Sequence, residues 1–202
     1  CEEIASRVDY YLKQWRNDTA SDDSFVITAN CPRFGTGEAK AVFPHTARGL
    51  DVFIICDCFN HGVTYKMYGQ TVPMSPDDHF QDLKRIIAAV GGKARRITVI
   101  MPFLYESRQH KRNGRESLDC AFALQELVSM GVDNIITFDA HDPRVQNAIP
   151  LNGFETVQPV YQFIKALLNS VDDLKIDSDN MMIISPDAGA MGRAVYFSNV
   201  LG

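Results

Sequence analysis

The sequence predicts an α/β fold in which helices flank a parallel β-sheet. Short, uninterrupted apolar runs that suit buried strands alternate with longer segments whose apolar residues recur at helical spacing. This alternation is typical of a parallel sheet with helices on both faces. Polar residues also gather directly after several of the expected strands, at the sheet edge where such folds bind ligands.

The expected elements follow one another in a regular order. A helix is expected first, in residues 3–16, because Ile4, Val8 and Leu12 fall on one face. The run DVFIIC, residues 51–56, is rich in β-branched residues and suits a strand buried on both faces. A long loop, residues 57–76, comes next. The same two patterns predict strands in 96–103, 134–140 and 180–187, and helices in 77–90, 116–131 and 157–171.

Three of these helices carry signals at their ends. Asp77 or Asp78 is placed to cap the second expected helix. Gly131 is placed to end the helix that precedes it. Pro159 is expected in the first turn of the last helix.

Composition excludes several classes of protein. The chain has 202 residues and a net charge of −5, whereas a protein that binds duplex nucleic acid is more often basic, so no nucleic-acid partner is expected. No stretch approaches the roughly 20 apolar residues that span a bilayer, and the N-terminus does not resemble a signal peptide. We therefore expect no membrane association.

The five cysteines favour a reducing, cytoplasmic location, because an odd number at uneven spacing does not suggest a disulfide framework. Cys56, Cys58 and His61 are conceivable metal ligands, but their spacing matches no standard zinc pattern. Thiols that pack near a loop are the favoured interpretation.

Loop residues cluster at 149–159 and indicate a domain boundary. We expect an N-terminal α/β domain over residues 1–153. Residues 154–202 are expected to begin a second domain that is incomplete where the chain ends.

Three polar clusters follow expected strands. Four cations lie within the stretch MPFLYESRQHKRNGRE, residues 101–116. Carboxylates and a histidine follow in FDAHD, and Asp187 follows in SPDAG. Arginine suits phosphate oxygens, whereas aspartate and histidine suit a divalent metal, so together the clusters predict a site for a magnesium nucleotide. Each cluster also has a purely structural explanation. The basic loop is then only solvated, His141 bonds a backbone carbonyl, and Asp187 serves a turn or caps a helix. The four cations are Arg108, Lys111, Arg112 and Arg115, and the second cluster holds Asp139, His141 and Asp142.

Four segments closely resemble the ribose-phosphate pyrophosphokinase family, whose members are also called phosphoribosyl pyrophosphate synthetases. The segments read RFGTGEAKAVFPHTARGLDVFII, MPFLYESRQHKRNGRES, GVDNIITFDAH and IISPDAGAMGRA. The resemblance covers most of residues 30–202, and several motifs in the right order make it specific.

The resemblance implies an activity and an assembly. Members transfer the β,γ-diphosphoryl group of Mg-ATP to the C1 hydroxyl of ribose 5-phosphate, and the products are AMP and phosphoribosyl pyrophosphate. The expected ligands are thus ATP and ribose 5-phosphate, with Mg²⁺ as cofactor. Each subunit is expected to have two domains like those of type I phosphoribosyltransferases, the first of which binds ATP. The subunits are expected to form a homo-oligomer, a dimer or a hexamer.

The resemblance also implies roles for individual residues. His141 and Arg108 are the expected catalytic residues. Asp187 is expected to bind both metal and ribose, with Asp139 and His141 as further metal ligands. Arg48 is expected at a regulatory phosphate site. The residues expected to bind ATP are Phe34, Thr36, Gly37, Glu38, Arg108, Gln109, Lys111, Arg112 and His141, of which Phe34 and Glu38 would reach the adenine across a subunit interface.

The chain departs from the family pattern in several places. His110 stands where the family has an aspartate, Thr36 replaces an Asn or Asp, and the loop at 56–76 is longer. The sequence ends at AVYFSNVLG, before the family's flexible catalytic loop and its ribose 5-phosphate loop. The chain is expected to be part of a longer enzyme, because an end at this point would leave a strand edge uncovered. The alternative is a non-catalytic, nucleotide-binding regulatory homologue that associates with an active synthetase.

Overall fold

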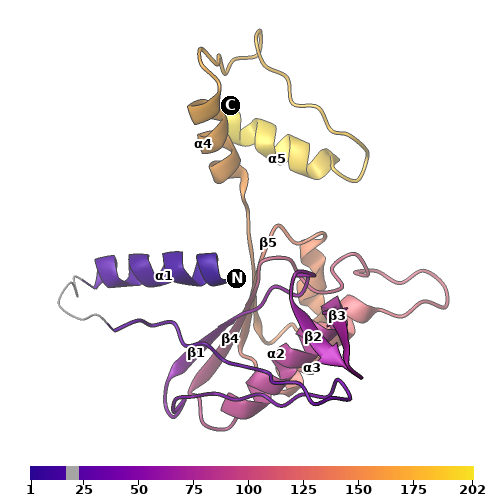
Figure 1. Cartoon of the computed structure of the whole chain (residues 1–202). Helices are drawn as coiled ribbons and strands as arrows, with labels where there is room; N and C mark the ends of the chain where they lie inside the picture. The colour runs from indigo at the N-terminus through magenta and orange to yellow at the C-terminus, as the bar shows by residue number, and fades with distance from the viewer. Residues whose placement is uncertain (17–22) are drawn as a thin grey trace. The chain divides into compact units, whose positions relative to one another are not determined.

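The computed structural model describes residues 1–16 and 23–202 (Figure 1). The chain divides into two compact units, Cys1–Val157 and Gln158–Gly202. The first unit extends past residue 153, where the sequence predicted a boundary. It does so because strand β6 (Gly153–Val157) pairs with strand β5 (Asn134–Phe138).

The first unit contains a parallel sheet of four strands in the order β1-β4-β5-β6. β1 (Asp51–Ile55), β4 (Arg96–Met101) and β5 confirm three strands expected from sequence. β6 was not predicted, because it lies in the stretch whose loop residues indicated a boundary.

Two helices cover one face of this sheet (Figure 1). The parallel register sets Ile54 beside Val99 and Val99 beside Ile135, so these side chains share a face. They pack in one core with residues of α2 (Pro76–Val90) and α3 (Asp119–Ser129). The core residues that these helices supply include Leu83, Ile87, Leu124 and Leu127.

The opposite face of the sheet is more exposed. Phe53 of β1 is 61% exposed and Phe138 of β5 is 39% exposed. Helix α1 (Glu2–Trp15) forms where it was predicted but has no buried residue. The sequence predicted helices on both faces of the sheet. Among the described residues of the first unit, helices pack against one face. The expectation that the first strand is buried on both faces was wrong, because Phe53 on the outer face of β1 is largely exposed.

The segment predicted as a long loop contains an antiparallel hairpin. Its strands are β2 (Thr64–Met67) and β3 (Gln70–Pro73). Tyr68 and Gly69 join them, both with positive φ, as the tight turns of hairpins require.

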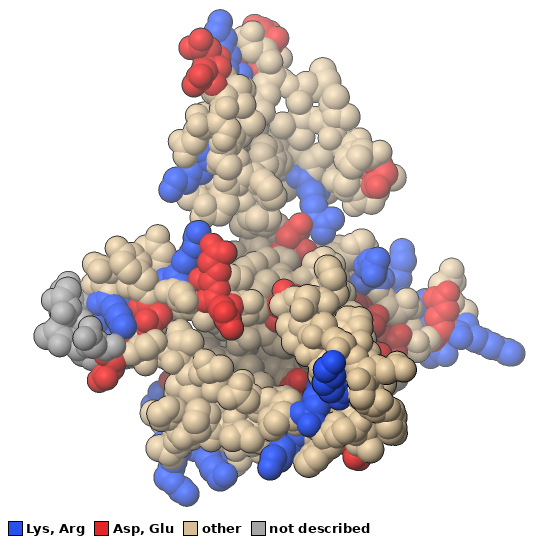
Figure 2. All heavy atoms as spheres, in the orientation of Figure 1, with Lys and Arg blue, Asp and Glu red and all other residues tan. Residues whose placement is uncertain are grey.

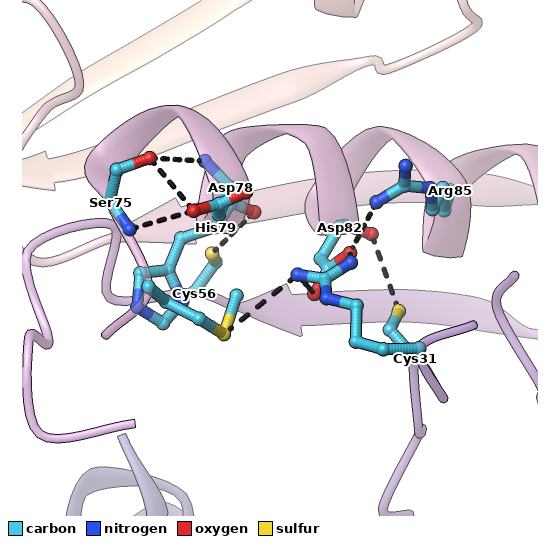
Figure 3. Close-up of polar contacts among 9 residues, drawn as sticks. Cys31, Cys56, Ser75, Asp78, His79, Asp82 and Arg85 are labelled. Carbon is cyan, nitrogen blue, oxygen red and sulfur yellow. Dashed lines mark hydrogen bonds and ion pairs between the residues drawn. The ribbon is translucent and has the colours of Figure 1, made fainter. Parts of the chain in front are cut away.

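Helix α2 begins with a capping box (Figure 3). The hydroxyl of Ser75 accepts the N–H of Asp78 at 3.1 Å, and the Asp78 carboxylate accepts the N–H of Ser75 at 2.9 Å. The cap is therefore Ser75 rather than Asp77 or Asp78, although Asp78 completes the motif. Gly131, placed by the sequence as a helix end, lies just past α3 with a φ of +94°.

The second unit contains two helices, α4 (Val160–Ser170) and α5 (Met191–Leu201). Pro159 is the N-cap of α4, directly before its first turn. The strand predicted at 180–187 does not form. Met182 and Ile184 are 80% and 77% exposed. An apolar run becomes a strand only where a neighbouring strand accepts its backbone hydrogen bonds.

In the described part of the chain, no helix is both long enough and apolar enough to cross a bilayer.

Candidate functional site

The loop between β4 and α3 carries the cations that the sequence singled out. We call residues 108–115 the basic loop. Arg108, Lys111, Arg112 and Arg115 are all exposed, and Lys and Arg side chains gather on the loop that extends from the sheet (Figures 1 and 2). Their charges are therefore available to an anion from solvent.

Gln109 closes the base of the basic loop. Its side-chain N–H group donates to the backbone oxygen of Ser117 at 2.8 Å and to that of Lys111 at 3.3 Å. Its own backbone oxygen accepts the N–H of Cys120, in the first turn of α3, at 3.3 Å. The structure thus gives Gln109 a role in the shape of the loop, beside the ATP contact expected from sequence.

The turn after β5 holds the second polar cluster. Asp139 has a φ of +44°, a left-handed conformation that residues with side chains adopt rarely and mostly at turns or functional sites. The N–H of Asp139 donates to the backbone oxygen of Val157 in β6. The N–H of Ala140 donates to the hydroxyl of Thr156 at 2.8 Å. The chain is thereby turned away from the strand, and His141 is exposed.

The structure brings these two loops into contact through His110. Its Nε2 lies 3.5 Å from Oδ2 of Asp142, and its ring centroid lies 5.0 Å from that of His141. The side chains of His110 and Asp142 are each only 12% exposed. The Nδ1 atom of His110 is buried and has no hydrogen-bond partner within the described residues.

Arg144 also holds Asp142 in place. Nε of Arg144 donates to both carboxylate oxygens, at 2.9 and 3.1 Å, and the backbone N–H of Arg144 donates to Oδ1 at 2.9 Å. These hydrogen bonds from Arg144 hold the pKa of the Asp142 carboxyl well below its usual range. Asp142 also caps the short helix η1 (Pro143–Ala148). The sequence placed Asp142 in this cluster but did not assign it a role.

The expected adenine segment, Phe34–Glu38, forms a turn. The N–H of Phe34 donates to the oxygen of Glu38 at 2.7 Å, and the Thr36 hydroxyl donates to the Glu38 carboxylate at 3.0 Å. The Phe34 ring is 53% exposed, and Glu38 is exposed as well. The turn lies against the β2–β3 hairpin, where the N–H of Tyr68 donates to Gly35 at 2.8 Å.

Arg48 lies at the other end of the sheet from His141. It precedes β1, whereas His141 follows β5, and the two strands run parallel. Arg95 and Arg96 donate to Asp51 nearby, which lowers the pKa of that carboxyl to about 2. The structure therefore separates Arg48 from the basic loop.

Asp187 belongs to the second unit. Its Oδ1 accepts the N–H of Ala190, the N-cap of α5, at 2.8 Å, and its backbone oxygen accepts the Ser185 hydroxyl at 2.6 Å. It thus serves the helix start, one of the alternatives raised from sequence. Within residues 1–16 and 23–202, no three His, Cys, Asp or Glu side chains gather to hold a metal ion by themselves.

The cysteines noted from sequence pack at the end of β1. Cys58 is fully buried in the core, and its sulfur lies 3.8 Å from that of Cys56. The Cys56 thiol lies 4.0 Å from the backbone oxygen of His79 (Figure 3). Both are free thiols, as expected of packing residues.

A cavity of about 440 Å³ lies between α2, α3 and the residues Tyr105 and Glu106, which precede the basic loop. Tyr105, on its wall, stacks on Phe80 at 4.2 Å and donates to Asp77 at 2.6 Å. Burial and this carboxylate raise the pKa of Tyr105. No sequence pattern indicated this cavity. Its charged lining, mostly carboxylate, does not suit a phosphate: Asp77, Lys84, Glu106, Asp119 and Glu126.

Comparison with known proteins agrees with the motifs. The family profile of the N-terminal domain of ribose phosphate pyrophosphokinase matches residues 1–131. A ribose-phosphate pyrophosphokinase of Mycobacterium leprae is 28% identical over 183 residues, which cover 89% of this chain and 50% of that protein. One of Corynebacterium efficiens is 29% identical over 172 residues, covering 84% and 46%. The chain spans about half the length of these curated relatives.

A solved structure shares the fold. The crystal structure of phosphoribosylpyrophosphate synthetase from Mycobacterium smegmatis matches with a TM-score of 0.70 at 23% identity, over 88% of this chain and 53% of that one. The profile match covers more than half of the 202 residues. On this ground, and as its motifs predicted, the chain belongs to the ribose-phosphate pyrophosphokinase family.

Proposed function

We propose that this chain supplies the nucleotide-binding half of a ribose-phosphate diphosphokinase, which transfers the diphosphoryl group of Mg-ATP to ribose 5-phosphate. The observation that carries the proposal is the contact between the basic loop and the turn after β5. His110 makes this contact, to Asp142 at 3.5 Å and to the ring of His141. It brings exposed cations and candidate metal ligands to one edge of the sheet, where parallel folds bind nucleotides.

The basic loop would bind the phosphates. Arg108, Lys111 and Arg112 are exposed and repel one another, so a triphosphate among them would relieve that repulsion. Gln109 holds the base of the loop closed and so fixes where these cations stand. Such pre-arranged charges act on a phosphoryl group without reorganisation.

Asp139 and His141 are the proposed metal ligands of the first unit, and Asp187 that of the second. Oxygen atoms are the ligands that Mg²⁺ prefers, and Mg²⁺ often takes only one or two carboxylates from a protein, with phosphates and water completing its shell. Asp139 and His141, in the turn that follows β5, would supply such a shell with one carboxylate and one imidazole. When bound, Mg²⁺ would neutralise phosphate charge.

The proposed reaction is an in-line displacement. The C1 hydroxyl oxygen of ribose 5-phosphate attacks the β-phosphorus and forms the new O–P bond, while its proton passes to water. The bond between the β-phosphorus and the oxygen that bridges to the α-phosphate breaks, and AMP leaves with that oxygen. The residues of this chain position the nucleotide and balance its charge rather than form covalent bonds. Arg108 and His141 are the proposed catalytic residues. Loss of one cation that acts in the transition state would cost about 2–4 kcal/mol.

Two further roles belong to the same proposal. Asp187 would contact the ribose, and Arg48, at the other end of the sheet, would hold a regulatory phosphate. A homo-oligomer is proposed because the adenine contact of Phe34 and Glu38 would be made across subunits. A cytoplasmic location is proposed for the same enzyme.

A regulatory homologue without turnover is the second candidate. It is favoured by His110, which stands at the junction of the two loops where the family has an aspartate. This candidate would bind Mg-ATP but form no AMP.

Titration of the isotopically labelled chain with Mg-ATP, followed by amide NMR, tests the nucleotide site. Shifts concentrated in 108–115, 139–142 and 34–38 are expected. Shifts confined to other segments, or none at millimolar Mg-ATP, would rule out the proposed site.

A further inference from the structure

An ion pair beneath the Phe34–Glu38 turn is almost closed off from solvent. Nη1 and Nη2 of Arg33 donate to the two carboxylate oxygens of Asp82, at 2.7 and 2.8 Å. The Arg33 side chain is 8% exposed and that of Asp82 is 15% exposed. A bidentate fork of this kind fixes direction as well as distance.

Several elements enclose this ion pair. Asp82 lies on α2, and Arg85 of the same helix also donates to its carboxylate at 2.7 Å (Figure 3). The backbone oxygen of Asp82 accepts a hydrogen bond from the Cys31 thiol. The Arg33 guanidinium lies 4.8 Å from the centre of the Tyr65 ring on β2. Its Nη2 also lies 3.9 Å from the sulfur of Met74. Arg33 thus ties its own segment to the helix and to the hairpin.

Fold stability alone does not explain a buried ion pair here. Removing two charges from water offsets much of their attraction, and apolar residues of similar volume often replace such a pair at little cost or with a gain. What an apolar pair cannot supply is the fixed orientation of the fork.

The fixed position of Arg33 also restrains the turn that follows it. Arg33 pairs with Ala39 in an antiparallel bridge, which closes Phe34–Glu38 at its base. The N–H of Gly37 donates to Phe34 at 2.9 Å, and a Cβ at Gly37 would lie 2.9 Å from the Met67 sulfur. The backbone of the turn is held from below while the Phe34 ring and Glu38 remain exposed.

We infer that Arg33 and Asp82 are positioning residues that hold the Phe34–Glu38 turn in the geometry in which it receives the adenine. The inference rests on the proposed function, in which this turn contacts the base. Neither side chain touches the nucleotide. The ion pair acts by ordering the turn before binding, which lowers the entropy lost on binding.

The test compares two double variants of the protein. Arg33→Met with Asp82→Leu replaces the ion pair by apolar groups that keep the space filled. Lys84→Met with Glu126→Leu removes a second, more exposed ion pair, 2.8 Å long, that joins α2 to α3 and does not touch the turn. Arg33→Lys keeps the charge but loses the fork. Each is measured by thermal midpoint, by amide exchange at Phe34 and Gly37, and by calorimetric titration with Mg-ATP.

The first double variant should stay folded with a slightly lower thermal midpoint, because Arg85 loses its partner Asp82. It should exchange both amides faster and bind Mg-ATP about tenfold more weakly. Arg33→Lys should fall between it and the wild type, and the Lys84/Glu126 variant should match the wild type in exchange and affinity. Unchanged affinity in the folded first variant overturns the inference, whatever its exchange rates. A wild-type protein that binds no Mg-ATP overturns the proposed function instead, and the exchange rates then decide whether the ion pair orders the turn.

Discussion

Nε2 of His110 lies 3.5 Å from Oδ2 of Asp142, and this contact joins two loops that follow neighbouring strands. Asp142 is ionised at neutral pH, as an aspartate ordinarily is, and the hydrogen bonds from Arg144 lower its pKa further. The pair therefore anchors the basic loop beside His141. If the proposed site is correct, weakening this anchor should weaken nucleotide binding without removing any group that touches phosphate.

Asp142→Asn tests that anchor. The amide keeps its size and one acceptor for the start of η1 but loses the negative charge that faces His110. We expect the Kd for Mg-ATP to rise about fivefold, because the contact with His110 weakens and Arg144 loses one of its two carboxylate acceptors. Calorimetric titration measures it, with Asp172→Asn, an exposed aspartate of the second unit, as the control. Equal affinities for the two variants would show that the His110 contact does not shape the site.

Arg108→Ala distinguishes a binding loop from a merely solvated one. An exposed cation that touches nothing contributes little, whereas one that contacts phosphate contributes a charge-assisted hydrogen bond. We expect about a tenfold loss of Mg-ATP affinity at low salt, and a weaker dependence of the remaining affinity on salt. Arg7→Ala is the matched control, because Arg7 is an exposed arginine on α1. Equal losses in the two variants would contradict the proposed contact.

Gly37→Ala should destabilise the turn. Gly37 has a φ of +94°, which an alanine adopts only with strain, and its added Cβ would meet the Met67 sulfur at 2.9 Å. We expect a loss of about 1 kcal/mol or more in the free energy of unfolding. Gly35→Ala is the control, since nothing lies within 4 Å of its Cβ position. Urea unfolding measures both, and an equal effect of the two substitutions would refute the conformational argument.

Asp51 predicts a specific pH dependence. Hydrogen bonds from Arg95 and Arg96 lower its pKa from 3.8 to about 2. A carboxyl whose pKa is lowered by folding stabilises the fold above its ordinary pKa, and this contribution is lost as the pH falls toward the folded value. Between 3.8 and about 2, the wild type should therefore lose stability more steeply than Asp51→Asn. Urea midpoints across this range measure the slopes, and parallel slopes would disprove the assignment.

Three strands of the sheet were predictable from their apolar, β-branched composition. Residues 51–56, 96–103 and 134–140 are short runs rich in β-branched residues, and all three form strands. The run at 180–187 reads the same way but has no neighbouring strand among the described residues. The β2–β3 hairpin was missed because its two short strands are mixed in polarity and lie within a loop-like stretch.

The candidate site was predictable in outline only. That the loops after β4 and β5 share a sheet edge follows from parallel topology, and it is confirmed. That His110 faces Asp142, or that Arg33 pairs with Asp82, depends on side-chain packing between segments far apart in the chain. No periodic pattern reports such contacts.

Phosphorus NMR of the full-length gene product with Mg-ATP and ribose 5-phosphate distinguishes a diphosphokinase from a regulatory homologue. We expect AMP together with a diphosphate attached to the C1 oxygen, both formed only when ribose 5-phosphate is present. Unchanged ATP in a sample that demonstrably binds the nucleotide would contradict the enzyme and leave the regulatory homologue.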